Sequence, residues 1–190
     1  MGLNLITLAE YKAYIGITST TEDTKISTLL PIVSELTKTI CRRTFVDYVN
    51  DAKVEIYSGG QPKLQLKESP ILAISLLEYS SDYGSTYTSL VEYTDYVLDK
   101  EDDCIQCING TEFIKAPNAY KVTYTAGFET LPSDLKVAVM DLLTYYLKND
   151  MAVKSQRDSG SNTVKIEYIL SNALPAHIAR VFDLYKSSVD

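Results

Sequence analysis

Residues 120–150, with the sequence YKVTYTAGFETLPSDLKVAVMDLLTYYLKND, pass from a strand into a helix and decide how the rest of the chain is arranged. The first eight residues alternate between apolar and polar types, which is typical of a strand. Pro132 suits the first position of a helix over residues 131–149. One stripe of that helix is apolar and needs a partner: Leu135, Ala138, Val139, Leu142 and Tyr146.

Two helices are predicted near the N-terminus. The segment ITLAEYKAYIGI opens with a capping box, because Thr7 and Glu10 can exchange hydrogen bonds, and Gly16 is a natural stop. A second apolar stripe runs from Ile26 to about Cys41, and Pro31 inside it should kink or restart the helix. Neither helix buries its stripe alone, so both are expected to pack on the distant helix at 131–149.

The intervening residues have the alternation and turn signals of short strands. Strands are predicted in AKVEIYS, on both sides of Ser69-Pro70, and in YTDYVLD, DCIQCI, TEFI and YKVTYTAG. The polar segment SSDYGSTYTS should form a hairpin tip, and Asn109-Gly110 is the strongest single hairpin signal. The order of elements makes this block an insertion into a helical bundle rather than a second sequential domain.

The C-terminal part predicts a loop, one strand and a short helix. KSQRDSGSNT is polar and rich in Gly and Ser, VKIEYIL can form a strand, and LPAHIARVFDLYK a helix. We therefore expect an α+β fold, with a small bundle of about four helices and a long inserted antiparallel β subdomain. Residues 1–44 and 129–190 should form the helical body, and residues 45–128 the β subdomain.

Composition limits the classes of function. The chain has 190 residues, enough for a core without metal or disulfide staples, and a net charge of −7, which is a poor profile for gripping phosphate. The same charge suits a wall past which nucleic acid slides. Three cysteines, no secretory signal and no membrane-spanning apolar run favour a reducing, cytosolic setting. The 15 tyrosines fit either protein contacts or strands.

No pattern of residues predicts catalysis. The one histidine, His177, is expected at a surface or an interface, without a positioned nucleophile. Cys104 and Cys107 match C-x-x-C, but in a strand they point to opposite faces and cannot share a metal. The acidic run at residues 99–103 lacks the pattern of a calcium loop, and is interpreted as a solvated turn or as part of a channel wall. We predict that the chain is no enzyme and uses no cofactor or metal.

Three stretches together resemble the head–tail connector, or adaptor (head completion), family of tailed bacteriophages. They are the opening helical pair ITLAEYKAYIGITSTTEDTKISTLLPIVSELTKTICRRTF, the stretch at residues 120–150, and LPAHIARVFDLYK. The most specific part is V-T-Y-T-A-G, followed by a Leu-Pro step and an acidic-Leu-Lys helix start. SPILAISLLEY also resembles the Pro-led central strand of that family. The Tyr-rich hairpin is not part of the resemblance.

The resemblance implies a ring, expected to be dodecameric to match the portal, in the virion neck between capsid and tail. Its partners would be the portal protein, other neck or tail proteins and copies of itself, with assembly in the host cytoplasm and no membrane. Double-stranded DNA would pass through the lumen without specific binding, during packaging and ejection.

Candidate site residues follow from this implied assembly. The portal or neighbour interface would be formed by Leu174, Pro175, His177, Ile178, Val181, Phe182 and Tyr185. A flexible assembly loop would include Lys154, Gln156, Arg157, Asp158 and Gly160. A tail-side hairpin would present Tyr83, Gly84 and Tyr87. The acidic candidates for the lumen are Asp99, Glu101, Asp102 and Asp103.

Two other classes stay open from sequence. One is a small ligand- or carbohydrate-binding β module on a helical base, in which Tyr83 and Tyr87 would stack on sugar rings. The other is a small enzyme whose site is assembled from scattered carboxylates and tyrosines, with strongly shifted pKa values.

Overall fold

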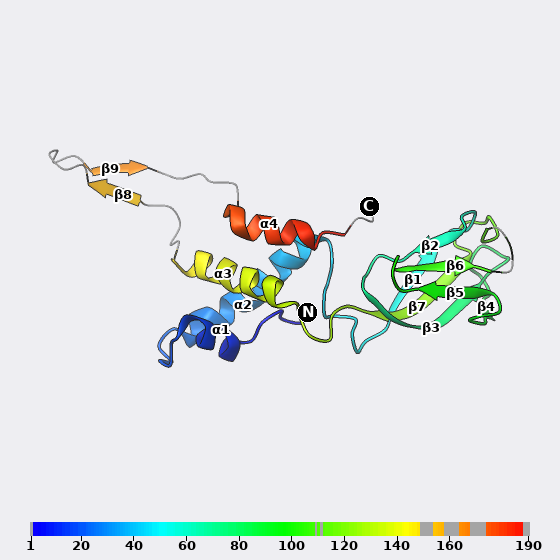
Figure 1. Ribbon diagram of the computed structural model, residues 1–190, viewed down its shortest axis with the longest axis horizontal. Coiled ribbons are helices and arrows are strands. Elements are labelled where there is room, and N and C mark those ends of the chain that lie inside the picture. The colour runs from blue at the N-terminus through cyan, green and yellow to red at the C-terminus, as the bar shows by residue number, and fades with distance from the viewer. Residues whose placement is uncertain are drawn as a thin grey trace. The chain divides into compact units, whose positions relative to one another are not determined.

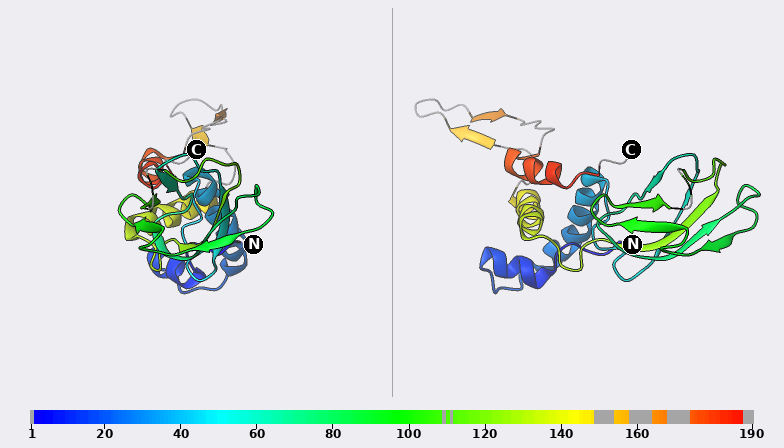
Figure 2. Two further views of the ribbon diagram at one scale, coloured as in Figure 1. Left: turned by 90° about the vertical axis from the view of Figure 1, so that its right-hand side faces the viewer. Right: turned by 45° about the vertical axis from the view of Figure 1, so that its right-hand side comes forward.

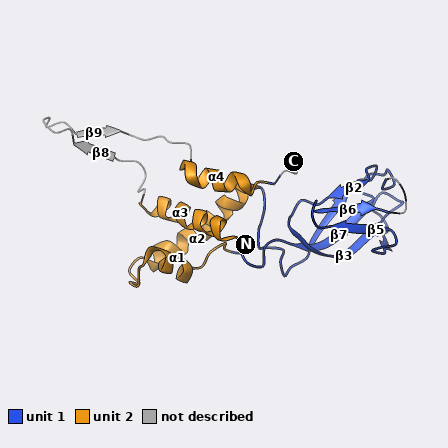
Figure 3. Ribbon diagram, viewed as in Figure 1, with its two compact units in different colours: residues 1–3, 42–131, 187–190 blue, residues 4–41, 132–186 orange. Residues whose placement is uncertain are grey.

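The chain divides into two compact units, coloured separately in Figure 3. The computed structural model describes residues 2–108, 110, 112–148, 154–157, 164–167 and 174–187, and only the backbone of 154–157 and 164–167. The β unit comprises residues 1–3, 42–131 and 187–190, and the helical unit comprises residues 4–41 and 132–186. The predicted α+β class, a helical bundle with an inserted antiparallel β subdomain, is confirmed.

The helical unit contains α1 (Leu8–Ile15), α2 (Asp23–Cys41), α3 (Ser133–Lys148) and α4 (Ala176–Leu184), as labelled in Figure 1. The capping box at α1 is confirmed, since the Glu10 amide donates to Thr7 Oγ1 at 3.2 Å and the Thr7 amide to Glu10 Oε2 at 2.8 Å. Gly16 ends α1 in the left-handed conformation, as predicted. None of the described helices is long and apolar enough to cross a membrane.

Pro31 lies inside α2, which continues as one helix to Cys41. Of the two outcomes expected at Pro31, a kink or a restart, the restart is therefore wrong. The amide that proline lacks would have bonded the carbonyl of Ser27, and Ser27 is exposed, so water can take that place. A proline in this position costs less than one that faces the core.

Helix α3 joins the N-terminal helices to the rest of the bundle, as the apolar stripes predict. Its buried residues include Leu135, Val139 and Leu142. Polar contacts also tie it to α1: the hydroxyls of Tyr11 and Thr144 are 3.0 Å apart, and Lys136 Nζ lies 2.8 Å from Glu10 Oε1. Figure 2 shows α4 beside α3 in two further views.

The β unit contains two antiparallel sheets. The strands are β1 (Lys53–Tyr57), β2 (Lys63–Gln65), β3 (Ile71–Tyr79), β4 (Thr88–Leu90), β5 (Tyr96–Asp99), β6 (Cys104–Cys107) and β7 (Tyr120–Ala126). The four-stranded sheet has the order β1-β7-β3-β4, and the three-stranded sheet has the order β2-β6-β5. The predicted strand TEFI is wrong for residues 112–114, because Phe113 turns into the core and its amide bonds the carbonyl of Gln61. Asn109 of the predicted hairpin lies outside the described residues.

The V-T-Y-T-A-G motif forms the central strand β7 and the turn that follows it. Tyr120, Val122, Tyr124 and Ala126 point into the core, and the residues between them are half-buried. Gly127 has φ +116, and a Cβ there would lie 2.3 Å from the carbonyl oxygen of Phe45. The amide of Phe128 bonds that same carbonyl at 2.7 Å. Glycine is needed because the two backbones touch.

A separate two-stranded antiparallel sheet is formed by β8 (Lys154–Arg157) and β9 (Val164–Glu167). The register pairs Lys154 with Glu167 and Arg157 with Val164. The predicted loop is therefore wrong for residues 154–157, since backbone pairing with the following apolar segment overrides their polar composition. The predicted strand at the start of VKIEYIL is confirmed.

Candidate functional site

An open groove of about 340 Å³ lies between α3 and the start of α4. Its lining residues come from two faces that pack against one another, and they are Asp141, Thr144, Tyr145, Lys148, Pro175, His177 and Ile178. The helix period places the α3 residues on one face, since they are three or four positions apart. Pro175 precedes the first turn of α4 and sets its direction.

Asp141 is the electrostatic centre of the groove. Its Oδ1 accepts a 2.8 Å hydrogen bond from the Tyr14 hydroxyl, and this bond raises the pKa of Tyr14. Its Oδ2 lies 3.7 Å from Nε2 of His177, whose side chain is 68% exposed. The nearby Thr144 hydroxyl donates to the carbonyl of Met140 at 2.9 Å. The Thr144 hydroxyl thus donates within its own helix and also lies 3.0 Å from the Tyr11 hydroxyl, so its proton is not directed at His177 as it would be in a pair of nucleophile and base.

Three residues of the predicted interface line this groove: Pro175, His177 and Ile178. The apolar face assigned to partner docking needs correction, because Ile178 and Phe182 are 1% and 0% exposed within the helical unit. Burial of that face in its own bundle satisfies the stripe without a partner. Leu174 and Val181 are half-buried.

Tyr185 is the C-cap residue of α4. Burial and the 2.7 Å hydrogen bond that its hydroxyl donates to Asp134 raise the pKa of Tyr185 to about 12. The same bond lowers the pKa of Asp134. Leu184, which is not among the predicted interface residues, is 74% exposed. The exposure of Leu184 could have been predicted from the sequence, because this residue lies outside the apolar stripe of an amphipathic helix.

The four acidic candidates for the lumen lie at the end of β5, which is Asp99, and in the turn that leads to β6. Asp99 accepts hydrogen bonds from the amides of Asp102 and Glu101, and these lower the pKa of Asp99. Asp102 pairs with Lys63 at 2.6 Å, and Asp103 Oδ1 accepts from the Ile71 amide at 2.8 Å. Three of the carboxylates therefore build the turn, and Glu101 is exposed.

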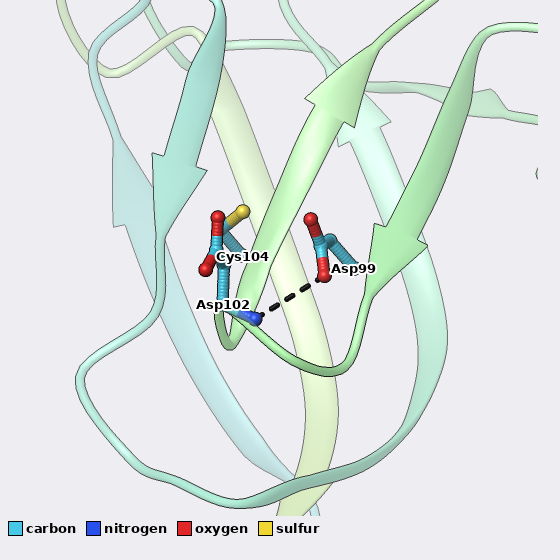
Figure 4. A group of neighbouring side chains, drawn as sticks. All are labelled: Asp99, Asp102 and Cys104. Atoms are coloured by element: carbon cyan, nitrogen blue, oxygen red, sulfur yellow. Dashed lines mark hydrogen bonds between the residues drawn. The ribbon is translucent and has the colours of Figure 1, made fainter.

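Figure 4 draws the side chains of Asp99, Asp102 and Cys104. Their ligand atoms lie within 4.8 Å of one another. The surroundings argue for a structural turn. Asp102 is already neutralised by Lys63, and burial raises the pKa of the Cys104 thiol and so opposes the thiolate that a metal prefers. Cys104 is fully buried, Cys107 is half-buried, and both are free thiols in β6.

The Tyr-rich turn after β3 presents one free aromatic ring. Tyr83 is 70% exposed at φ 60, and Gly84 follows it at φ 95. Tyr87 is engaged, since Lys121 Nζ lies 4.4 Å from its ring centroid and its hydroxyl donates to Asn118 O at 3.3 Å. A sugar-stacking pair would need both rings, so this geometry gives the carbohydrate-binding interpretation no support.

Asp82 holds this turn in shape. Its carboxylate accepts hydrogen bonds from the amide and hydroxyl of Thr86 and from the Ser80 hydroxyl. These bonds lower the pKa of Asp82 to about 2. Tyr83 is therefore displayed on a defined turn.

Of the residues assigned to an assembly loop, Lys154, Gln156 and Arg157 lie in strand β8. Asp158 and Gly160 fall outside the described residues. An assembly role for this segment stays a prediction, and its local structure is a hairpin strand.

An exposed apolar strip on the four-stranded sheet was not foreseen. Val54 and Ile56 on β1 are 56% and 54% exposed, and Leu76 on β3 is 37% exposed. Strict alternation in KVEIY carries the signal, because it places Val54 and Ile56 opposite the buried Glu55. Residues that look like core positions in sequence are thus the outer face of a strand.

Comparison with known proteins adds a family and a fold. The sequence profile described as head completion protein matches residues 4–188. A chain from the neck of an empty GTA particle, computed with C6 symmetry, superposes with a TM-score of 0.62 at 15% identity, covering 96% of this chain and 90% of that chain. A chain from the neck of a native GTA particle, computed with C12 symmetry, gives 0.60 at 16% identity, covering 98% and 96%.

A chain from the virion of a native gene transfer agent particle also superposes, with a TM-score of 0.62 at 15% identity. At these identities the superpositions show a shared fold over nearly the whole chain. A search of curated proteins gives no match.

Proposed function

The chain belongs to the head completion protein family, and from that premise we propose that it is the subunit of a ring that joins the capsid to the tail below the portal. Family membership makes it a structural component of the head–tail connector in the virion. The observation that carries the proposal is the extent of the match, since residues 4–188 include the whole helical unit and residues 42–131 of the β unit.

A closed ring is the assembly that suits one kind of subunit placed around a channel. The solved structures with the same fold come from particle necks computed with C6 and C12 symmetry. A cyclic arrangement needs two different surfaces on each subunit, which meet head to tail. We propose a dodecamer of this chain, with the portal, other neck or tail proteins and further copies of itself as partners.

The groove between α3 and α4 is the proposed contact with the portal or a neighbouring subunit. It combines an acidic centre at Asp141 with the exposed ring of His177 and the apolar Pro175. Leu184 adds an exposed apolar side chain on the same helix. Such a mixed surface fits a protein partner that brings one or two anchoring side chains.

The tail-side contact is proposed at the turn that displays Tyr83. The acidic turn supports a passage for double-stranded DNA, because Glu101 is exposed and the whole chain carries a net charge of −7. A surface of that sign lets phosphates pass without specific binding. Assembly in the host cytoplasm and a role without catalysis complete the proposal.

Electron microscopy of particles that contain this chain is the direct test. We expect a ring at the neck, twelve copies per particle and empty heads without tails when the gene is deleted. A deletion that leaves complete, tailed particles would overturn the proposal. A matched variant, Tyr83→Ala, should keep the ring and weaken tail joining, while Tyr93→Ala, which also removes an exposed tyrosine, should not.

A further inference from the structure

Strand β1 is an edge of the four-stranded sheet. It pairs with β7 on one side, from Lys53 opposite Tyr124 to Tyr57 opposite Tyr120. On its other side, no backbone hydrogen bond to another described residue is made by residues 53–57. The outward side chains Val54 and Ile56 are more than half exposed. An exposed edge strand with apolar side chains is a template for pairing with a further strand.

The β8–β9 hairpin would gain stability from pairing with a further strand. Within the described chain the two strands form a sheet of their own, with four residues in each strand. A two-stranded hairpin is marginally stable in water, and it gains stability from a third strand. Among the described residues no third strand pairs with its outer edges, just as none pairs with the open side of β1.

We propose that the β8–β9 hairpin of one copy of this chain pairs along β1 of the next copy and extends its four-stranded sheet. The proposal rests on the ring of the proposed function and names the surfaces that meet in it. Strand lengths agree, since β1 has five residues and each hairpin strand has four. In a closed ring every copy then offers its β1 edge to one neighbour and its β8–β9 hairpin to the other, so no β1 edge and no hairpin stays unpaired.

The negative charge of the β unit favours the basic strand β8 over an acidic strand as the partner of β1. Residues 42–131 contain 14 Asp and Glu against 8 Lys and Arg, a net charge of −6. Strand β8, with the sequence KSQR, carries two basic residues and no acidic one. A basic strand approaching an acidic unit gains in association rate, and backbone pairing then fixes the register.

Cysteine cross-linking between mixed subunits tests the pairing. Subunits with Ile56→Cys are mixed with subunits carrying Ser155→Cys or Gln156→Cys, all with Cys107→Ser, and assembled before a short bismaleimide is added. Neighbouring residues of a strand face opposite sides, so the two hairpin variants cover both faces. We expect a covalent dimer between the two kinds of subunit. Val91→Cys, with a side chain 58% exposed against 54% for Ile56, is the matched control.

Two results would overturn the inference while the ring itself stands. One is a ring whose Ile56→Cys subunits cross-link no more than the Val91→Cys control. The other is a hairpin cysteine that links to a different neck protein. Failure to form any ring in a complete particle would instead count against the proposed function.

Hydrogen exchange gives an independent readout on the unmodified chain. On assembly the alternate amides of residues 53–57 that point away from β7 should exchange at least about tenfold more slowly, while those that already bond β7 should change less. Replacing residues 154–167 by a short Gly-Ser linker should abolish that protection. Protection that persists without the hairpin would contradict the pairing. Ile56→Lys should reduce assembly where Val91→Lys does not, because a charged residue on an edge strand opposes strand addition.

Discussion

The hydroxyl of Tyr124 donates a 2.8 Å hydrogen bond to Oε2 of Glu55, inside the β unit. Burial alone would raise the pKa of Glu55, but hydrogen bonds from Tyr57, Lys53 and Tyr124 outweigh it and hold that pKa below its ordinary value. The same hydroxyl of Tyr124 accepts a hydrogen bond from the amide of Glu68, at 3.2 Å. One hydroxyl therefore joins the first strand, the central strand and the segment before β3.

Replacing Tyr124 by Phe should destabilise the β unit by about 1–3 kcal/mol, because the buried amide and carboxylate lose a partner and gain none. Urea unfolding followed by far-UV circular dichroism would measure the change. Tyr93→Phe, at a ring that is 78% exposed, is the control and should leave the midpoint unchanged. An equal midpoint for Tyr124→Phe would show that water replaces the hydroxyl.

Acid should weaken the helical unit through Glu10. The hydrogen bond from Lys136, followed by the one from the Thr7 amide, lowers the pKa of Glu10 from 4.5 to about 2. The unfolded chain thus binds the proton first as the pH falls, so the stabilisation is complete above pH 4.5 and is lost towards pH 2. Glu10 is 39% exposed, and solvent screening keeps the effect small.

Glu10→Gln should flatten this dependence. We expect a loss of roughly 0.5–1 kcal/mol at neutral pH and a smaller difference from the unmodified chain at pH 2. Thermal unfolding across this pH range is the measurement. Glu35→Gln is the control, because Glu35 also pairs with a lysine but is 55% exposed. Parallel curves for Glu10→Gln and the unmodified chain would contradict the assignment.

Two glycines with positive φ should differ in their tolerance of a side chain. At Gly127 a Cβ would meet Phe45 O at 2.3 Å, while at Gly16 nothing lies within 4 Å. Gly16→Ala should cost about 1 kcal/mol for the left-handed conformation alone. Gly127→Ala adds a collision between the new Cβ and the backbone carbonyl of Phe45, and it should cost more, roughly 3 kcal/mol or above. Equal losses in denaturant unfolding would show that the Phe45 segment moves aside.

Local chemistry made much of this fold predictable. The Thr7–Glu10 capping box, Gly16 and the alternation in β7 each act through neighbours in sequence, and the structure confirms them. The errors arose where distant partners decide. Residues 154–157 are polar, yet they form a strand because residues 164–167 lie opposite. Phe113 leaves its predicted strand because the core offers it a place beside Tyr120.

The candidate surfaces were harder to predict, for the same reason. Amphipathicity marks Ile178 and Phe182 as an apolar face, but it does not say whether that face meets its own chain or another. The groove depends on α3 and α4, which are separated by residues 149–175. The edge position of β1 depends on the sheet order, which no local pattern encodes.

Substitutions in the acidic turn should distinguish a carboxylate that stabilises the fold from one that is only exposed. Asp103→Ala removes the acceptor of the Ile71 amide, which lies 2.8 Å away, and should cost about 1–2 kcal/mol. Glu101→Ala should leave stability within about 0.5 kcal/mol, as expected for an exposed side chain away from special features. Denaturant midpoints of the two variants provide the comparison. A larger loss for Glu101→Ala would reverse the assignment.

Helix α4 allows the docking and folding roles to be separated. Phe182 is fully buried, and Phe182→Ala should destabilise the helical unit by about 3–5 kcal/mol. Leu184 is 74% exposed two residues away, so Leu184→Ala should keep the melting temperature and reduce assembly on the portal. Thermal unfolding and sedimentation with the purified portal measure the two effects. If Leu184→Ala assembles like the unmodified chain while His177→Ala does not, the contact lies at the groove end of α4 rather than along the helix.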